Sequence, residues 1–181
     1  MSIQAPAAEI AALRGVQRTL AARKPVVGAA RALSLFGEHS AGRFALGLLG
    51  AAVDRPRRKE WLTAAGGVVA AHAASIAVKR VVRRPRPDDP AIKVLVGTPS
   101  RLSFPSSHAA STTAAAVLYG GLTGRRVSVG VVPPMLLSRV VLGVHYPSDV
   151  LAGAALGAAV GGGVLRWLRR SQLRTGGGSA L

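Results

Sequence analysis

The sequence predicts an all-helical protein, a polytopic bundle of transmembrane helices with four clear spans, an N-terminal apolar hairpin and about six crossings. Two observations predict this fold class. Apolar residues make up 49% of the 181 residues, and several long runs of them carry no charge. The formal net charge is +17, and the basic residues lie mostly between these runs. Nucleic-acid-binding proteins share such a charge but do not usually carry long uncharged runs. A membrane protein with basic loops and an anion site explains the positive charge better.

The N-terminal part of the chain divides into two segments. Residues 1–25 are too polar to span a membrane, but apolar residues recur at near-helical spacing from Ile10 to Leu20, with arginines between them. This pattern predicts an amphipathic helix in the headgroup region. Residues 26–53 are mainly apolar, with a polar turn at Gly37–Ser40. They predict a hairpin of two short arms, and the sequence leaves open whether the arms cross the membrane fully.

Four later runs are candidates for full spans, because a helix needs roughly 17–25 residues to cross a bilayer. They place a membrane-embedded domain over residues 26–170, followed by a flexible tail over residues 171–181. The four runs are Trp61–Val78, Leu102–Gly124, Val127–Val144 (interrupted only by Arg139) and Val150–Leu165.

The distribution of lysine and arginine predicts the orientation of the bundle. Residues 1–24, 54–60, 124–126 and 166–181 together hold 14 basic residues, and all four segments share one side if the hairpin returns to where it began. Because basic loops favour the cytoplasm, this side is predicted to be cytoplasmic and to hold both termini. The opposite side would then face the outside of the plasma membrane.

Three polar segments lie at the predicted extracytoplasmic ends of the spans. Lys79–Pro87 ends one span, Pro105–His108 opens the next, and Ser138–Asp149 joins the last two. The second segment and the end of the third begin helices, and helix N-termini direct unpaired N–H groups and positive dipole ends at an anion. Arg139 lies inside a span, where an arginine is costly unless it faces a polar cavity. The segments therefore predict an anion site.

Two histidines in such a site can divide the cleavage of a phosphoester between them. One can attack phosphorus while the other protonates the leaving alkoxide. Asp149, four residues after His145, can hold the imidazole by one nitrogen so that the other presents its lone pair. Arginines can stabilise the charge on the transition-state oxygens.

The order and spacing of the three segments resemble the type 2 phosphatidic acid phosphatase (PAP2) superfamily, which includes the vanadium haloperoxidases. They fit KxxxxxxRP, PSGH and SRxxxxxHxxxD in turn, although Ser107 stands where the second motif has glycine. The resemblance implies a PAP2/haloperoxidase-like core and a phosphohistidine intermediate on His145, supported by Asp149, with His108 as the general acid. It implies neither a metal nor another cofactor. The residues that it implies for phosphate binding are Lys79, Arg86, Ser106, Ser107, Ser138 and Arg139.

Within the superfamily, the small size and the stretches Leu35–Ser40, Thr98–Pro105 and Gly143–Asp149 resemble the decaprenylphosphoryl-5-phosphoribose phosphatases of bacteria that build arabinan cell walls. This resemblance implies hydrolysis to decaprenylphosphoryl-ribose. Phosphatidic acid, phosphatidylglycerol phosphate and polyprenyl pyrophosphate are alternative substrates, and a non-catalytic basic membrane scaffold is the alternative of another class. The predicted partners are a lipid-linked phosphate substrate and membrane lipids, without nucleic acid; the oligomeric state stays open.

Other polar and small residues are interpreted as structural. His72 is expected to be packed or hydrogen-bonded within a helix. Glu38–His39 is expected to form a solvated turn, and Arg80, Arg83 and Arg84 are expected to anchor the bundle at anionic lipids. Glycines at every fourth position from residue 153 to 161 predict close helix packing within the bundle rather than a dimer interface.

Overall fold

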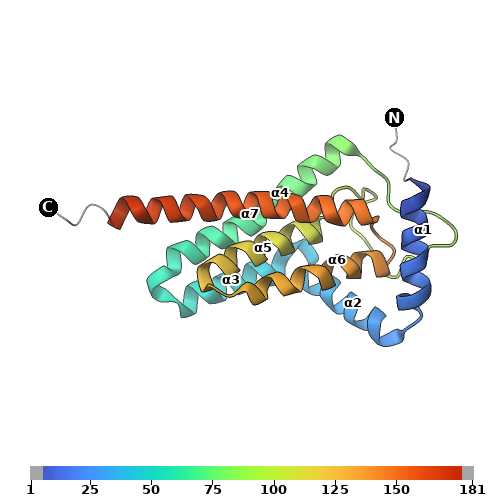
Figure 1. The fold of residues 1–181 in the computed structure, drawn as a ribbon, viewed down its shortest axis with the longest axis horizontal. Coiled ribbons are helices and arrows are strands. Elements are labelled where there is room, and N and C mark those ends of the chain that lie inside the picture. Colours follow the sequence, from blue (N-terminus) through green and yellow to red (C-terminus); the bar gives the residue numbers. More distant parts are fainter. Residues whose placement is uncertain (1–5, 177–181) are drawn as a thin grey trace.

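The structure, a computed structural model, describes residues 6–176, which form a bundle of helices (Figure 1). The all-helical prediction is confirmed, since the described residues hold no strand beyond an isolated bridge between Pro85 and Leu102. The helices are α1 (Ala7–Val16), continued by a π-helical turn at Gln17–Ala21, α2 (Lys24–Phe36), α3 (Ala41–Val53), α4 (Arg58–Val82), α5 (Ser107–Thr123), α6 (Val132–Val141) and α7 (Pro147–Gly176), with 3-10 segments at Glu38–Ser40, Arg55–Arg57 and Arg126–Val131.

The helix α5 packs against both α4 and α7, and glycines bring α7 close to it. A Cβ atom at Gly157 would overlap the carbonyl oxygen of Ala110, and one at Gly153 would overlap that of Ser106. The backbones of α5 and α7 therefore touch, which confirms the packing that the small-residue spacing predicts. This contact fixes the beginning of α5 relative to the beginning of α7, where two of the polar segments lie.

Two helical segments are long and apolar enough to cross a membrane, judged by length and composition. They are Arg55–Val82 and Pro147–Leu173. The helix α3 and the segment Val129–Val141 are apolar but shorter. The helical class thus agrees with the sequence prediction, but within the described residues two of the four predicted spans, Trp61–Val78 and Val150–Leu165, lie in helices of this length and composition. The runs Leu102–Gly124 and Val127–Val144 form shorter helices, so the predicted number of crossings stays a prediction.

Several boundaries differ from the sequence prediction, and two of them concern the polar segments or the tail. The run that begins at Leu102 becomes helical only at Ser107, because Ser106 caps α5 and the residues before it form a loop. At the other end of the chain, α7 continues to Gly176, so the predicted flexible tail is helical from residue 171 to that point.

The predicted hairpin forms, but its two arms are not equivalent. The helix α3 packs along α4, whereas α2 packs against α6 and the turn after it. Ala30 of α2 is buried against Leu142 and Val144 in that turn. The helix α2 therefore lies at one end of the bundle and does not run along its length (Figure 1).

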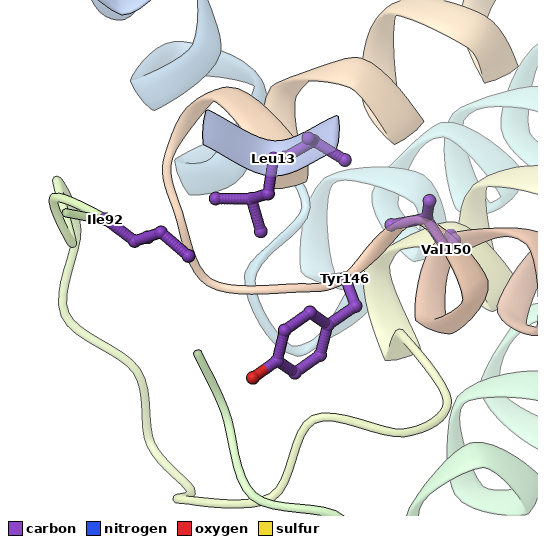
Figure 2. Close-up of a cluster of buried hydrophobic side chains, with 6 residues drawn as sticks. Leu13, Ile92, Tyr146 and Val150 are labelled. Carbon is purple, nitrogen blue, oxygen red and sulfur yellow. The ribbon is translucent and has the colours of Figure 1, made fainter. Parts of the chain in front are cut away.

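The helix α1 lies at the same end of the bundle as the turn between α6 and α7 (Figure 1). Figure 2 shows Leu13 of α1 beside Ile92 of the loop after α4 and Tyr146 of that turn. Arg14 adds an ion pair to Asp89 at 2.6 Å. The predicted amphipathic segment thus docks on the loops where the three polar segments meet.

The first and last described helices lie at opposite ends of the bundle, although the sequence predicts both termini on one side of the membrane. The helix α1 lies at one end of the bundle and the last turns of α7 lie at the other (Figure 1). The prediction assumed two passes along the bundle before Asp54, but only α3 makes such a pass. The basic residues of segment 1–24 consequently lie at the end that carries the three polar segments.

Candidate active site

A cavity of about 410 Å³ opens where the three polar segments meet. Its wall comes from α2, α4, α5, α6, the loop of residues 83–106 and the turn before α7. Residues from all three segments reach it, although they are up to 66 positions apart in the sequence. The predicted site residues on its wall are Lys79, Arg86, Ser107, His108, Arg139 and His145.

His145 lies in the turn between α6 and α7 and has different neighbours at its two ring nitrogens. Nη1 of Arg86 is 3.2 Å from Nε2, and Oδ2 of Asp149 is 3.4 Å from Nδ1. His145 is buried, and this burial, together with Arg86 and Lys79, lowers its pKa well below the usual value. The imidazole is therefore neutral near pH 7, so one of its two ring nitrogens carries no proton.

Asp149 is fully buried behind His145 and does not line the cavity. Its Oδ2 accepts a hydrogen bond from the N–H of Tyr146 at 2.9 Å, and its Oδ1 accepts one from Nη1 of Arg84 at 3.0 Å. Arg84 is itself buried, so its interpretation as a lipid anchor is wrong. The preceding residue, Arg83, ends α4 with a left-handed φ of 54°, and this turn leads the next side chain into the protein.

His108 is the second residue of α5 and lies beside α2. Its Nε2 is 3.0 Å from the carbonyl oxygen of Ser34. Ser106 caps α5, since its Oγ accepts a hydrogen bond from the N–H of Ala109 at 3.5 Å, and its side chain is not on the cavity wall. The cap begins the helix at Ser107 and so places His108 in the first turn.

Adjacent residues of α6 point in different directions. The hydroxyl of Ser138 donates to the carbonyl oxygen of Met135 at 2.7 Å, and this side chain lies away from the cavity. Arg139 lines the cavity and donates from Nη1 to Oγ of Ser34 at 2.6 Å. An arginine one turn inside a helix is costly in an apolar setting, and here it faces the polar wall of the cavity.

Lys79 and Arg86 are held on the cavity wall by backbone carbonyl groups. Nζ of Lys79 donates to Ser103 at 2.8 Å and to Pro105 at 2.6 Å, and Nε of Arg86 donates to Ser100 at 2.8 Å. Burial lowers the pKa of Arg86 to about 10, so its guanidinium stays charged near pH 7. Hydrogen bonds to carbonyl groups of the loop of residues 83–106 therefore hold both cations in place on the cavity wall.

Ser107, which stands in place of the motif's glycine, adopts an ordinary helical conformation. It is absent from the positions with positive φ in the described chain. Its hydroxyl forms a hydrogen bond with that of Ser75 in α4, at 2.7 Å. The side chain is therefore accommodated against α4, and the backbone at this position does not require glycine.

Of the two helix N-termini predicted to face the anion site, that of α7 does not. The N–H of Ser148 donates to Oε1 of Glu9 at 3.0 Å, and residues 147–149 are not on the cavity wall. A carboxylate is favourable at a helix N-terminus, because the unpaired N–H groups and the helix dipole attract negative charge. Glu9 of α1 therefore occupies the position that was predicted to receive a ligand.

Arg43 is a buried cation beside the site that the sequence interpretation passed over. Its Nη1 donates to the carbonyl oxygen of Gly37 at 3.1 Å and to Oγ of Ser111 at 3.2 Å. A Cβ atom at Gly37 would come within 2.6 Å of both the Arg43 guanidinium and the His108 ring, so glycine allows both groups to approach this turn. The available signal was an arginine inside an apolar arm, which needs polar partners.

Residues interpreted as structural also line the cavity, among them His72, Glu38 and Arg80. Nδ1 of His72 is 2.8 Å from Oγ of Ser40, which confirms that this histidine is hydrogen-bonded. The side chain of His39 lies outside the described part of the structure. The hairpin turn thus contributes to the cavity wall and not only to a solvated surface.

Sequence comparison finds a matching superfamily and similar relatives. A sequence profile of the PAP2 superfamily matches residues 60–173, a range that contains all nine predicted site residues. The decaprenylphosphoryl-5-phosphoribose phosphatase of Mycobacterium tuberculosis (strain H37Rv) is 56% identical over 161 residues, which cover 89% of this chain and 91% of that protein. A protein of the same name from Mycolicibacterium smegmatis is 58% identical over 149 residues, which cover 82% and 83%.

Two solved structures share the fold. The transmembrane PAP2-type phosphatidylglycerolphosphate phosphatase of Bacillus subtilis has a TM-score of 0.76 at 22% identity, covering 91% of this chain and 88% of that one. LpxE of Aquifex aeolicus has a TM-score of 0.71 at 22% identity, covering 92% and 99%. The profile match and the relatives confirm the resemblance carried by the three polar segments, and the chain belongs to the PAP2 superfamily.

Proposed function

We propose that the protein is an integral-membrane lipid phosphate phosphatase, a phosphoric monoester hydrolase that acts through a phosphohistidine intermediate on His145. One observation carries this proposal: His145 lies between Asp149 and Arg86 on the wall of a cavity lined by cations. The carboxylate orients the imidazole, and the cations attract a phosphate to its other nitrogen. This arrangement suits nucleophilic attack on phosphorus.

The reaction has two steps. In the first, Nε2 of His145 bonds to phosphorus while the ester P–O bond breaks, and His108 gives a proton to the leaving alkoxide oxygen. In the second, water attacks the phosphohistidine, the P–N bond breaks, and His108 takes up a proton from the water as phosphate leaves. Asp149 stabilises the positive charge on the imidazole ring of His145 in both steps.

The phosphate is bound by the cations on the cavity wall. Lys79, Arg86 and Arg139 neutralise the charge that develops on its oxygens in the transition state. The N–H groups at the start of α5, beginning with Ser107, add donors from a helix N-terminus. Ser106 acts indirectly, because it caps that helix. Ser138 lies away from the cavity, where its hydroxyl donates to the carbonyl oxygen of Met135.

We place the protein in the plasma membrane with α3 to α7 crossing the bilayer, α3 and α6 being lengthened by the 3-10 segments that directly precede them, and with α1 and α2 at the membrane surface. This arrangement has five crossings where the sequence predicts about six. The end of the bundle away from the cavity carries ten basic residues, in segments 54–60, 125–126 and 166–174. Short basic loops between spans, such as 54–60 and 125–126, favour the cytoplasm, whereas several basic residues at the cavity end are buried in the site and do not lie in loops. This difference supports an extracytoplasmic active site.

The proposed substrate is decaprenylphosphoryl-5-phosphoribose, and the products are decaprenylphosphoryl-ribose and phosphate. The two mycobacterial relatives that carry this substrate in their names support the choice. The product would serve the synthesis of arabinan precursors for the cell wall. Phosphatidic acid, phosphatidylglycerol phosphate and polyprenyl pyrophosphate are the competing substrates, because the same chemistry would act on each.

A substrate panel on purified protein in detergent tests the proposal. Wild type is expected to release phosphate from decaprenylphosphoryl-5-phosphoribose faster than from the competing lipids, at a rate that a metal chelator does not change. His145→Ala is expected to abolish release, whereas Arg101→Gln, at an exposed loop position, serves as the matched control and keeps it. Full activity of His145→Ala would contradict the mechanism, and preference for another lipid would contradict the substrate.

A further inference from the structure

The N-terminal helix α1 reaches the carboxylate behind His145 through one arginine. Oε2 of Glu9 accepts a hydrogen bond from Nη2 of Arg84, and Oε1 accepts the N–H of Ser148 at 3.0 Å. From its other side, Nη1 of Arg84 donates to Oδ1 of Asp149 at 3.0 Å and to Oγ of Ser148 at 2.7 Å. One guanidinium therefore joins a residue near the start of the chain to a residue 140 positions later.

This network is buried and charged, so its geometry is closely constrained. The exposed fraction is 5% for the Arg84 side chain, 16% for that of Glu9 and 0% for that of Asp149. Removing one partner of a buried ion pair leaves an uncompensated charge, which favours keeping all three together. The guanidinium also lies 4.3 Å from the ring centroid of Tyr146. Arg84 is thus held by two carboxylates and an aromatic ring.

Glu9 is ionised in this network. Burial raises the pKa of its carboxyl, but hydrogen bonds from Ser148 and Arg84 outweigh that effect and lower the pKa below its usual value. The ionised carboxylate accepts from both donors at once. It therefore fixes the position of Arg84 relative to the start of α7.

The orientation of Asp149 depends on this fixed arginine. Oδ2 of Asp149 faces Nδ1 of His145 and the N–H of Tyr146, while Oδ1 faces Arg84. If Arg84 moved, the buried Oδ1 would lose its charged partner, and the carboxylate would rotate to recover one. Such a rotation would carry Oδ2 away from the imidazole.

We infer that Glu9 is a positioning residue for the reaction: through Arg84 it holds Asp149 in the orientation that aligns His145. The inference rests on the proposed function for its kinetic part. It makes α1, which the sequence predicts only as a surface helix, a component of the catalytic machinery.

The simpler alternative is that Glu9 only docks α1 on the loops. Other contacts already dock this helix. Arg14 pairs with Asp89 at 2.6 Å, Gln17 donates to the carbonyl oxygen of Lys93 at 2.7 Å, and Leu13 is buried in an apolar cluster. The Arg14–Asp89 pair does not touch Arg84 or Asp149, so it provides a matched control.

The test compares Glu9→Gln with Asp89→Asn in the full-length protein. Each change keeps the side-chain shape and removes one carboxylate. Glu9 belongs to α1, and Asp89 forms an ion pair with Arg14 of α1. We expect Glu9→Gln to lower kcat by about 10- to 100-fold, the range observed when the outer partners of a metal-ligating histidine are removed, with KM little changed. Asp89→Asn should keep the wild-type kcat, even if its Tm falls. Arg84→Lys, which keeps the charge but not the planar fork, should lower kcat as Glu9→Gln does.

Binding of inorganic vanadate supplies a readout that needs no lipid. Vanadate adopts the five-coordinate geometry of a phosphoryl group in transfer, so its affinity depends on an aligned His145. We expect a higher Kd in Glu9→Gln and an unchanged Kd in Asp89→Asn. If wild type binds vanadate but hydrolyses none of the lipids, the proposed substrate fails while the positioning role is still tested by these Kd values.

Two results would overturn the inference. One is a wild-type kcat and vanadate Kd in Glu9→Gln. The other is an equal loss of kcat in Glu9→Gln and Asp89→Asn that follows their loss of Tm, which would assign Glu9 to docking alone. Should Glu9→Gln fail to fold, Arg84→Lys decides the question by the same two measurements.

Discussion

At the scale of single residues, the site depends on how burial and charge act on His145. The ring is removed from water, which disfavours its protonated form, and cationic neighbours disfavour that form further. The same cations that attract phosphate therefore also keep one ring nitrogen of His145 free of a proton. Asp149 acts in the opposite direction once positive charge develops on the ring during the reaction.

These opposing effects predict the pH dependence of the enzyme. Only neutral His145 can attack, and its lowered pKa keeps it neutral in mildly acidic solution. The acid limb of kcat/KM is therefore expected below about pH 6.5, the usual pKa of histidine. Arg86→Gln removes a cation, so it should raise this pKa and move the acid limb to higher pH. It should also lower kcat by about 100-fold, as loss of a transition-state donor does.

Arg101→Gln is the control for the pH profile, since it removes the same charge at an exposed position. Profiles of phosphate release between mildly acidic and neutral pH give the measurement. An acid limb that moves equally in both variants would mean that overall charge, and not Arg86, sets the pKa of His145.

The position of Ser107 predicts which of its groups binds phosphate. The hydroxyl is bonded to that of Ser75, and the residue begins a helix, where the first N–H groups have no partner within the helix. We expect Ser107→Ala to keep most of kcat while losing about 1 kcal/mol of stability, the typical value of one neutral hydrogen bond. Phosphate release and thermal unfolding measure the two effects. A large loss of kcat with unchanged Tm would instead assign phosphate binding to the hydroxyl.

At the scale of helices, the site depends on the contact between α5 and α7. His108 lies in the first turn of one helix and His145 lies two residues before the start of the other, so the closeness of the two backbones sets the distance between acid and nucleophile. Glycine at residues 153 and 157 permits that closeness, because a side chain at either position would meet backbone atoms of α5. A small residue far along a helix can thus control the geometry at its end.

Replacement of one of these glycines tests this role. In Gly157→Ala, the added methyl group overlaps the carbonyl oxygen of Ala110. We expect a loss of about 1–3 kcal/mol in stability, the usual cost of overpacking, and a lower kcat because the two histidines separate. Gly162→Ala is the control in the same helix, since open space surrounds that position. Equal Tm and kcat in the two variants would show that the helices do not need glycine to pack.

At the scale of the whole molecule, the two ends of the helical bundle differ. The helix α1 lies at the cavity end and the last turns of α7 lie at the opposite end (Figure 1). Basic residues are therefore present at both ends. At the cavity end several of them, including Lys79, Arg84 and Arg139, are buried and belong to the site. A count of charges along the sequence does not distinguish these from exposed loop residues.

Cysteine labelling in intact cells tests this arrangement, and the chain suits it because it contains no cysteine. Arg23→Cys places a thiol at the exposed start of α2, and Arg169→Cys places one on the exposed end of α7. A reagent that does not cross membranes is expected to label Arg23→Cys from outside and Arg169→Cys only after the cells are broken. Labelling of both from the same side would contradict the proposed number of crossings.

Much of this protein can be predicted from local sequence. Runs without charge predict helices in a membrane, and the three segments Lys79–Pro87, Pro105–His108 and Ser138–Asp149 predict the superfamily. Proline and serine at Pro105–Ser106 predict the start of a helix, to within two residues. These predictions succeed because each depends on neighbours in the chain, where spacing translates directly into a helix face or a cap.

What only the tertiary structure decided is where the N-terminal region lies and which charges are buried together. The apolar sequence around Ala30 is compatible with a membrane crossing and also with a helix packed across the end of α6. Its packing partners in the folded chain decide which of the two forms. Likewise, nothing in the local sequence distinguishes Arg84 from the basic residues around it. The fold does, because it brings Glu9 and Asp149 from distant parts of the chain into hydrogen-bond contact with Arg84. The reason is physical: local sequence determines whether a segment becomes a helix, but the free energy of burying a charge depends on partners that only the folded chain brings together.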